Sequence, residues 1–154
     1  VDVVAASLMP GPVNCSRGTR LLADALLDEV LQQPFDMLVL PGGMPGSEHL
    51  KNDARIQALL THYAAEGRYI AAICAAPMAL HAAGLLEGKR ATSFPGVLDQ
   101  LPGTHHYLED AVVTDGNIVT SRGPGTAMSF ALALVGLLCG EAKRQAVEEP
   151  LQRS

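Results

Sequence analysis

Residues 67–84 (GRYIAAICAAPMALHAAG) constrain the possible folds more than any other stretch of the sequence. The run Arg68–Ile73 is wholly apolar after its first residue, which predicts a strand buried on both faces of a parallel sheet. From Ala75 onward the residues favour a helix, with Pro77 tolerated because it falls in the first turn. Cys74 is therefore predicted to lie where a buried strand turns into a helix.

A cysteine at this position has two interpretations. A sharp turn from strand to helix places a side chain at the carboxyl edge of the sheet and directs free N–H groups toward it, as in enzymes with a nucleophile at such a turn. Those N–H groups favour the thiolate, which is the form that attacks carbon and is easily oxidised. Equally, a cysteine between Ile73 and Ala75 is a common small core residue.

Composition narrows the class of protein. The 154 residues fit a single domain, 1–154, large enough to bury a core without disulfides or metal. A formal net charge of -5 and the lack of a basic run argue against nucleic acid as a partner. The apolar runs are broken before membrane-spanning length, so we expect no membrane partner and a cytoplasmic location. The three widely spaced cysteines form neither a disulfide framework nor a zinc pattern, and we expect no metal or nucleotide cofactor.

Strand-like and helix-like segments alternate along the chain, which favours a mostly parallel sheet with helices on both faces. The predicted strands are residues 1–6, 37–40, 68–73, 90–96 (RATSFPG) and two extended pieces of 111–123 around Asp115-Gly116. The predicted helices begin near residue 25 and cover 47–66, the stretch after Cys74, and 126–139, with Gly140 as the last helix's stop.

Pro41-Gly42-Gly43 forms a second candidate site, because it follows the predicted strand 37–40. Glycines at a strand's carboxyl end allow backbone N–H groups to approach a ligand or a developing oxyanion. A tight turn requires glycine too, so the motif alone is weak evidence. Together, Cys74 could attack while the N–H groups of Gly43 and Ala75 receive the oxygen.

Three stretches, VLPGGMPGSEHL, AAICAAP and TSRGPGTAMSFALAL, in this order and spacing, resemble the ThiJ/PfpI superfamily. The match is closest to the branch of the Parkinson-linked deglycase and its bacterial relatives, in which CSRG also has a counterpart. The resemblance implies a flavodoxin-like three-layer sandwich and a homodimer. It also implies that Cys74 is the reactive cysteine and that Gly43 and Ala75 donate to the oxyanion.

The same resemblance places Cys15, Arg17 and Pro124 in the active-site wall, where the family's dimer interface passes. Members normally begin with a strand, a loop carrying a glutamate that hydrogen-bonds the reactive cysteine, and a helix. The sequence given opens on VDVVAAS, which resembles the family's second strand. We therefore expect the native protein to have this βα unit, which the sequence given lacks.

The histidines and the other cysteines are further candidates for the site. Some family members pair the cysteine with a histidine, and His105 and His106 lie in roughly the matching loop, although adjacent histidines on a polar loop are usually solvated. Cys139, in an apolar helix end, is predicted to be core. Cys15, in a turn-like stretch, is either exposed and oxidisable or part of a dimer contact.

Three functions remain open. The resemblance implies a cofactor-free enzyme of glyoxalase III or deglycase type, which converts reactive dicarbonyls such as methylglyoxal into hydroxy acids and takes small carbonyl substrates or glycated groups. The alternative is a redox-sensing or chaperone-like stress protein that uses oxidation of Cys74. A peptidase or amidase of the PfpI type ranks last because it requires a well-placed histidine.

Overall fold

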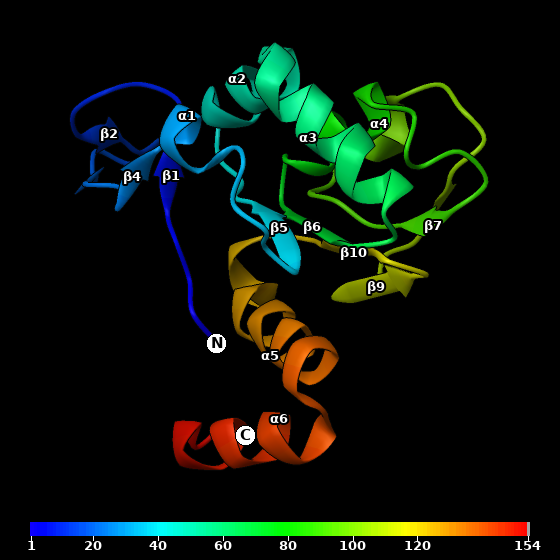
Figure 1. The fold of residues 1–154 in the computed structure, drawn as a ribbon. Coiled ribbons are helices and arrows are strands. Elements are labelled where there is room, and N and C mark those ends of the chain that lie inside the picture. The colour runs from blue at the N-terminus through cyan, green and yellow to red at the C-terminus, as the bar shows by residue number, and fades with distance from the viewer. Residues whose placement is uncertain (154) are drawn as a thin grey trace.

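A four-stranded sheet with the order β5-β6-β10-β9 carries the fold in the computed structural model, which describes residues 1–153 (Figure 1). β5 and β10 both run parallel to β6, and β9 pairs with β10 in an antiparallel hairpin. The strand bounds are Met37–Leu40 for β5, Tyr69–Ile73 for β6, Val112–Asp115 for β9 and Ile118–Ser121 for β10. The strand predicted at 37–40 and the hairpin around Asp115-Gly116 are confirmed.

Helices cover both faces of this sheet, as Figure 1 shows. The helices are α1 (Leu27–Val30), α2 (Gly46–Asn52), α3 (Ala54–Ala65), α4 (Pro77–Ala82), α5 (Ala127–Cys139) and α6 (Glu141–Glu148). Short 3₁₀ turns occupy Leu98–Gln100, Pro124–Thr126 and Glu149–Leu151. No helix within residues 1–153 is long and apolar enough to cross a membrane.

The side chains of β6 alternate between two hydrophobic clusters. Ile70 and Ala72 belong to the larger cluster, which α3 and α4 also supply, whereas Ala71 belongs to a smaller cluster with Phe130 of α5. All three β6 residues are fully buried. Successive strand residues point to opposite faces, so a strand covered on both sides must be apolar throughout. This explains why the run before Cys74 has no polar residue.

Three two-stranded sheets lie outside the main one. They are β1 (Ala6–Ser7) with β4 (Ala25–Leu26), the β2 (Val13–Asn14) and β3 (Arg20–Leu21) hairpin, and β7 (Arg90–Ala91) with β8 (His106–Tyr107). The predicted strand 1–6 is therefore wrong in extent, since only its last residue belongs to β1. The helix predicted near residue 25 starts two residues later, after β4.

The prediction of a third main-sheet strand at 90–96 is also wrong. Only Arg90 and Ala91 are extended and paired, and their partner is β8. Beyond them the Thr92 N–H donates to the Thr120 hydroxyl at 2.9 Å instead of to a strand backbone. A side-chain hydrogen bond thus replaces the backbone hydrogen bonds of a strand at this point. The chain is therefore free to turn toward Cys74.

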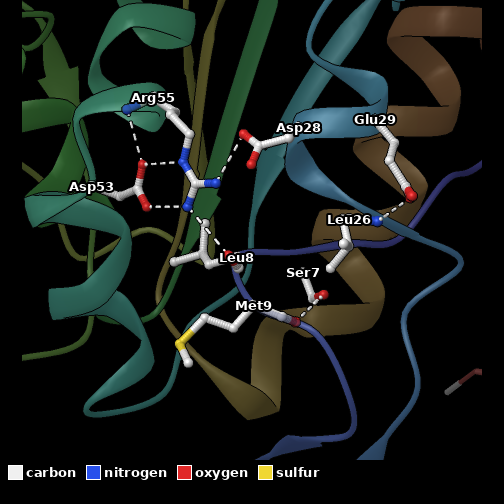
Figure 2. A network of polar contacts seen from close by, with 8 residues as sticks. All are labelled: Ser7, Leu8, Met9, Leu26, Asp28, Glu29, Asp53 and Arg55. Carbon is white, nitrogen blue, oxygen red and sulfur yellow. Dashed lines mark hydrogen bonds and ion pairs between the residues drawn. The ribbon is translucent and has the colours of Figure 1, made fainter.

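One arginine ties the N-terminal segment to α3 (Figure 2). Arg55 donates to the Asp53 carboxylate from Nη2 at 2.7 Å, to Asp28 at 2.9 Å and to the Leu8 carbonyl oxygen at 3.2 Å. Asp53 also accepts from the Arg55 backbone N–H, so it is the N-cap of α3. The hydrogen bonds from Arg55 hold the pKa of the Asp53 carboxyl below its usual range.

We predict that Asp53→Ala lowers the free energy of unfolding by about 1 kcal/mol or more at pH 7, because it removes the α3 cap as well as the charge. Asp53→Asn keeps a capping oxygen and should lose less. The depressed pKa means that the Asp53 charge stabilises the fold above about pH 4, the ordinary carboxyl value, and that this is lost as the pH falls through the lower folded value. Urea unfolding at pH 7 and pH 3 measures both effects. If the loss of unfolding free energy in Asp53→Asn relative to wild type were as large at pH 3 as at pH 7, the charge argument would be contradicted.

Candidate active site

Cys74 lies at the turn between β6 and α4, as the sequence predicted. β6 ends at Ile73, α4 begins at Pro77, and Cys74 has a φ of 66°. This left-handed conformation is sparsely populated by residues with a side chain and costs on the order of 1–3 kcal/mol. The surrounding structure must therefore hold Cys74 in place.

Two backbone hydrogen bonds hold it. The Cys74 N–H donates to the Ser121 carbonyl oxygen at 2.9 Å, which continues the β6–β10 ladder one step past the strand. The Cys74 carbonyl oxygen accepts from the Phe94 N–H at 2.8 Å. The residue is thus fixed from both sides of its peptide unit while its side chain remains half-buried.

Gly42 leaves the space that the Cys74 side chain occupies. A Cβ on Gly42 would stand 2.5 Å from the Cys74 Cβ, 2.8 Å from the Ile73 carbonyl oxygen and 3.3 Å from the Cys74 Sγ. Contacts under 3.0 Å are essentially never observed, so only glycine fits here without a shift. Gly42, the first glycine of the pair after β5, therefore packs directly against Cys74.

The predicted oxyanion donors lie on the two loops that meet here. Gly43 follows Gly42 with a φ of 96°, and Ala75 follows Cys74. Across residues 1–153, neither the Gly43 N–H nor the Ala75 N–H has a backbone hydrogen-bond acceptor. Unpaired N–H groups on loops next to a cysteine can stabilise negative charge that develops on a bound oxygen.

The β2–β3 hairpin reaches this site through its tip. The Ser16 hydroxyl lies 3.4 Å from where a Cβ on Gly43 would stand. Its neighbours Cys15 and Arg17 therefore lie at the same tip, with Cys15 half-buried and Arg17 exposed. Pro124 opens the 3₁₀ turn after β10 and is exposed.

The structure places the two predicted histidines elsewhere in the fold. His105 has its Nε2 2.9 Å from the Leu98 carbonyl oxygen and its ring edge-on to His81, with ring centres 5.4 Å apart. Both rings line a hollow of about 130 Å³ with Glu87, and Cys74 is not among its lining residues. His106 is exposed on β8. A role for either histidine stays a prediction without a contact to support it.

The prediction that Cys139 belongs to the core is wrong, because its side chain is exposed. It occupies the last residue of α5, where the helix has passed the sheet, so apolar neighbours in sequence do not bury it. Gly42 was predicted at the site as part of the Pro41-Gly42-Gly43 motif. Phe94 and Ser121, whose backbones hydrogen-bond Cys74, were not predicted, because no local pattern pointed to them. Among residues 1–153, no cluster of three or more His, Cys, Asp or Glu side chains could hold a metal ion.

We predict that Gly42→Ala disrupts the cysteine turn, because the new methyl would overlap the Cys74 Cβ and the Ile73 oxygen. The expected loss of stability is about 1–3 kcal/mol, as for other overpacked sites. The alkylation rate of Cys74, followed by peptide mass spectrometry with iodoacetamide, should change as well.

Gly46→Ala is the matched control, since a Cβ there meets nothing within 4 Å. It should leave both the unfolding midpoint and the Cys74 alkylation rate close to wild type. Equal behaviour of the two variants would show that the contact between Gly42 and Cys74 does not constrain the turn.

Known proteins share the sequence and the fold of this chain. The model of the DJ-1/PfpI family matches residues 1–137. The glutathione-independent glyoxalase DJR-1.2 of Caenorhabditis elegans is 38% identical over 152 residues, which is 98% of this chain and 81% of that protein. Protein DJ-1 homolog B of Arabidopsis thaliana is 43% identical over 140 residues, or 90% of this chain, and the chain spans only 32% of that longer relative.

A solved structure of Toxoplasma gondii DJ-1 in an oxidised form superposes with a TM-score of 0.92 at 36% identity, covering 99% of this chain and 84% of that one. This likeness confirms the predicted flavodoxin-like α/β fold with helices on both faces. The family match over most of the sequence and the shared fold lead to one conclusion: the chain belongs to the DJ-1/PfpI family.

Proposed function

We propose that this protein is a cofactor-free enzyme that converts small reactive dicarbonyls, such as methylglyoxal, into hydroxy acids with Cys74 as the nucleophile. The observation that carries the proposal is the left-handed turn at Cys74, pressed against Gly42 and flanked by the unpaired N–H groups of Gly43 and Ala75. A strained turn of this kind holds a side chain out of the core and ready for reaction. The name of the relative DJR-1.2 supports the same reaction class.

The first step is addition. The Cys74 thiolate forms an S–C bond to the aldehyde carbon, and the electron pair of the C=O bond moves onto the oxygen. The N–H groups of Gly43 and Ala75 donate to this oxygen and stabilise its charge in the resulting hemithioacetal. Sulfur suits the step because cysteine is the most nucleophilic of the side chains at neutral pH.

The second step moves one proton and the third releases the acid. An acid/base group takes the proton from the former aldehyde carbon to give an enediol, and a proton returned to the neighbouring carbon leaves a thioester of the hydroxy acid. Water cleaves the thioester and restores the thiol. One carbon is oxidised and its neighbour is reduced, so the reaction balances with water as the only co-reactant.

We predict that Cys74→Ser lowers turnover of methylglyoxal by on the order of 10²-fold or more, because a serine hydroxyl is a far weaker nucleophile than a cysteine thiolate at neutral pH. Cys139→Ser is the matched control, because it removes an exposed thiol at the far end of α5. It should retain nearly full activity. Release of lactate, measured by chromatography, is the assay.

Equal losses in both variants would point to misfolding and would contradict the nucleophile assignment. The competing function is redox sensing through a Cys74 sulfinate, and the oxidised state of the Toxoplasma relative favours it as the second candidate. A gain of two oxygen atoms on Cys74 under mild peroxide, in a preparation that produces no lactate, would favour redox sensing over the enzymatic function.

We also propose that the protein works as a two-fold dimer in which Arg17 lies at or near the contact beside the Cys74 site. Arg17 is exposed on the hairpin tip whose Ser16 lies over Gly43, and Pro124 is exposed on the loop after β10. An arginine fork at such a seam can reach several carbonyl or carboxylate oxygens of a neighbouring chain.

The wild type should therefore scatter light as a dimer at micromolar concentration, and Arg17→Ala should shift it toward monomer. Arg20→Ala is the control, because Arg20 is also exposed on this hairpin but lies in β3, away from the tip. A wild-type protein that is monomeric and fully active at that concentration would rule the dimer out.

A further inference from the structure

We infer that Phe94 is a specificity-determining residue that gives the Cys74 site a preference for carbonyl compounds bearing an aromatic group. This inference rests on the proposed function of the site and names its substrate class. Phe94 is 48% exposed, although large apolar side chains are usually buried. Among the Phe and Tyr residues of the described chain, 1–153, it is the one classed as exposed, and the sequence contains no Trp.

The backbone of Phe94 is fixed beside the reactive residue. Its N–H donates to the Cys74 carbonyl oxygen at 2.8 Å, and its own carbonyl oxygen accepts from the Val97 N–H at 3.1 Å and the Ser93 hydroxyl at 3.0 Å. These three hydrogen bonds fix the Phe94 backbone next to the Cys74 turn. The exposed ring therefore projects from a backbone held beside Cys74.

The ring packs on a backbone that also contacts the site. A Cβ on Gly123 would stand 3.2 Å from the Phe94 Cδ2, so glycine there allows the ring to lie close to the chain after β10. That chain segment includes Ser121, whose carbonyl oxygen accepts the Cys74 N–H. One side of the ring thus rests on Gly123, while part of it remains open to solvent.

An exposed aromatic face beside a nucleophile can be covered by a ligand group. An aryl substituent on the carbonyl compound would bury against the ring in an offset or edge-on arrangement, whereas a methyl group offers little area. An aromatic pair is worth a factor of about 2 to 12 in rate or affinity. We therefore expect aryl-substituted 2-oxoaldehydes, of which phenylglyoxal is the simplest, to be better substrates than methylglyoxal.

Thiol labelling tests the inference without relying on turnover. The probes are N-phenylmaleimide and N-methylmaleimide, which add to a thiolate in the same way and differ in the aryl group. The ratio of their rates at Cys74, divided by the same ratio at the exposed Cys139, cancels the intrinsic reactivity of the probes. Peptide mass spectrometry separates the two sites.

This normalised ratio should exceed one in the wild type and fall about 2- to 12-fold in Phe94→Ala. Phe94→Leu, which keeps an apolar side chain and the backbone contacts, should lose less. Leu151→Ala removes a similarly exposed apolar group, 41% exposed near the C-terminal end, and should change nothing. An unchanged ratio in Phe94→Ala would overturn the inference.

Kinetics of phenylglyoxal and methylglyoxal separate this inference from the proposed function. A wild-type preference for phenylglyoxal in kcat/KM that disappears in Phe94→Ala supports both. Turnover of both substrates at equal efficiency overturns the Phe94 assignment alone. Absence of turnover with either substrate, alongside a labelling ratio that depends on Phe94, overturns the enzyme and leaves the aryl preference of the site supported.

Discussion

The left-handed backbone of Cys74 is the constraint on which the rest of the structure depends. The conformation costs on the order of 1–3 kcal/mol, and the hydrogen bonds to Ser121 and Phe94 hold it from two separate segments of the chain. Gly42, from a third segment, leaves room for the Cys74 side chain because it has no Cβ. Because β5, β6 and β10 lie side by side in parallel, the loops that follow them meet at one edge of the sheet. The fold therefore brings together four parts of the chain that are far apart in sequence.

The strength of a sequence pattern decided how well each element could be predicted. The bounds of β5 and β6 were predicted within one residue. Strands buried on both faces must be apolar throughout, and these two end abruptly at the Pro-Gly-Gly motif and at the Cys74 turn. α5 was also predicted within one residue, because a 13-residue helix ended by a glycine with a φ of 84° leaves two independent signals. The prediction of a strand at 90–96 failed because two paired residues followed by a side-chain hydrogen bond are too short to give a detectable sequence periodicity.

The residues of the site also differ in how well the sequence predicted them. Cys74 and the glycine pair were predictable because local chemistry at a strand end restricts which residues fit. Phe94 was not, since its contact with Cys74 is a backbone hydrogen bond across 20 residues and its ring lies on a glycine far along the chain. His105 was singled out by its residue type, but its ring nitrogen is held by the Leu98 carbonyl oxygen. Residue type alone predicted a role for His105 at the sulfur, and that role stays a prediction.

The chemical character of these surroundings bears on which of the proposed reactions suits the site. A peptidase needs a base that activates the nucleophile and then protonates a poor amine leaving group, which is the task of a histidine next to sulfur. Here the contacts of Cys74 come from backbone groups, a glycine and the residue that carries an aromatic ring. Addition to an aldehyde expels no leaving group, so stabilisation of the new oxyanion by N–H groups matters more than a strong acid. Addition of a thiolate to a small, electrophilic aldehyde carbon relies mainly on these backbone N–H groups, and an apolar substituent on the carbonyl compound would gain from contact with Phe94.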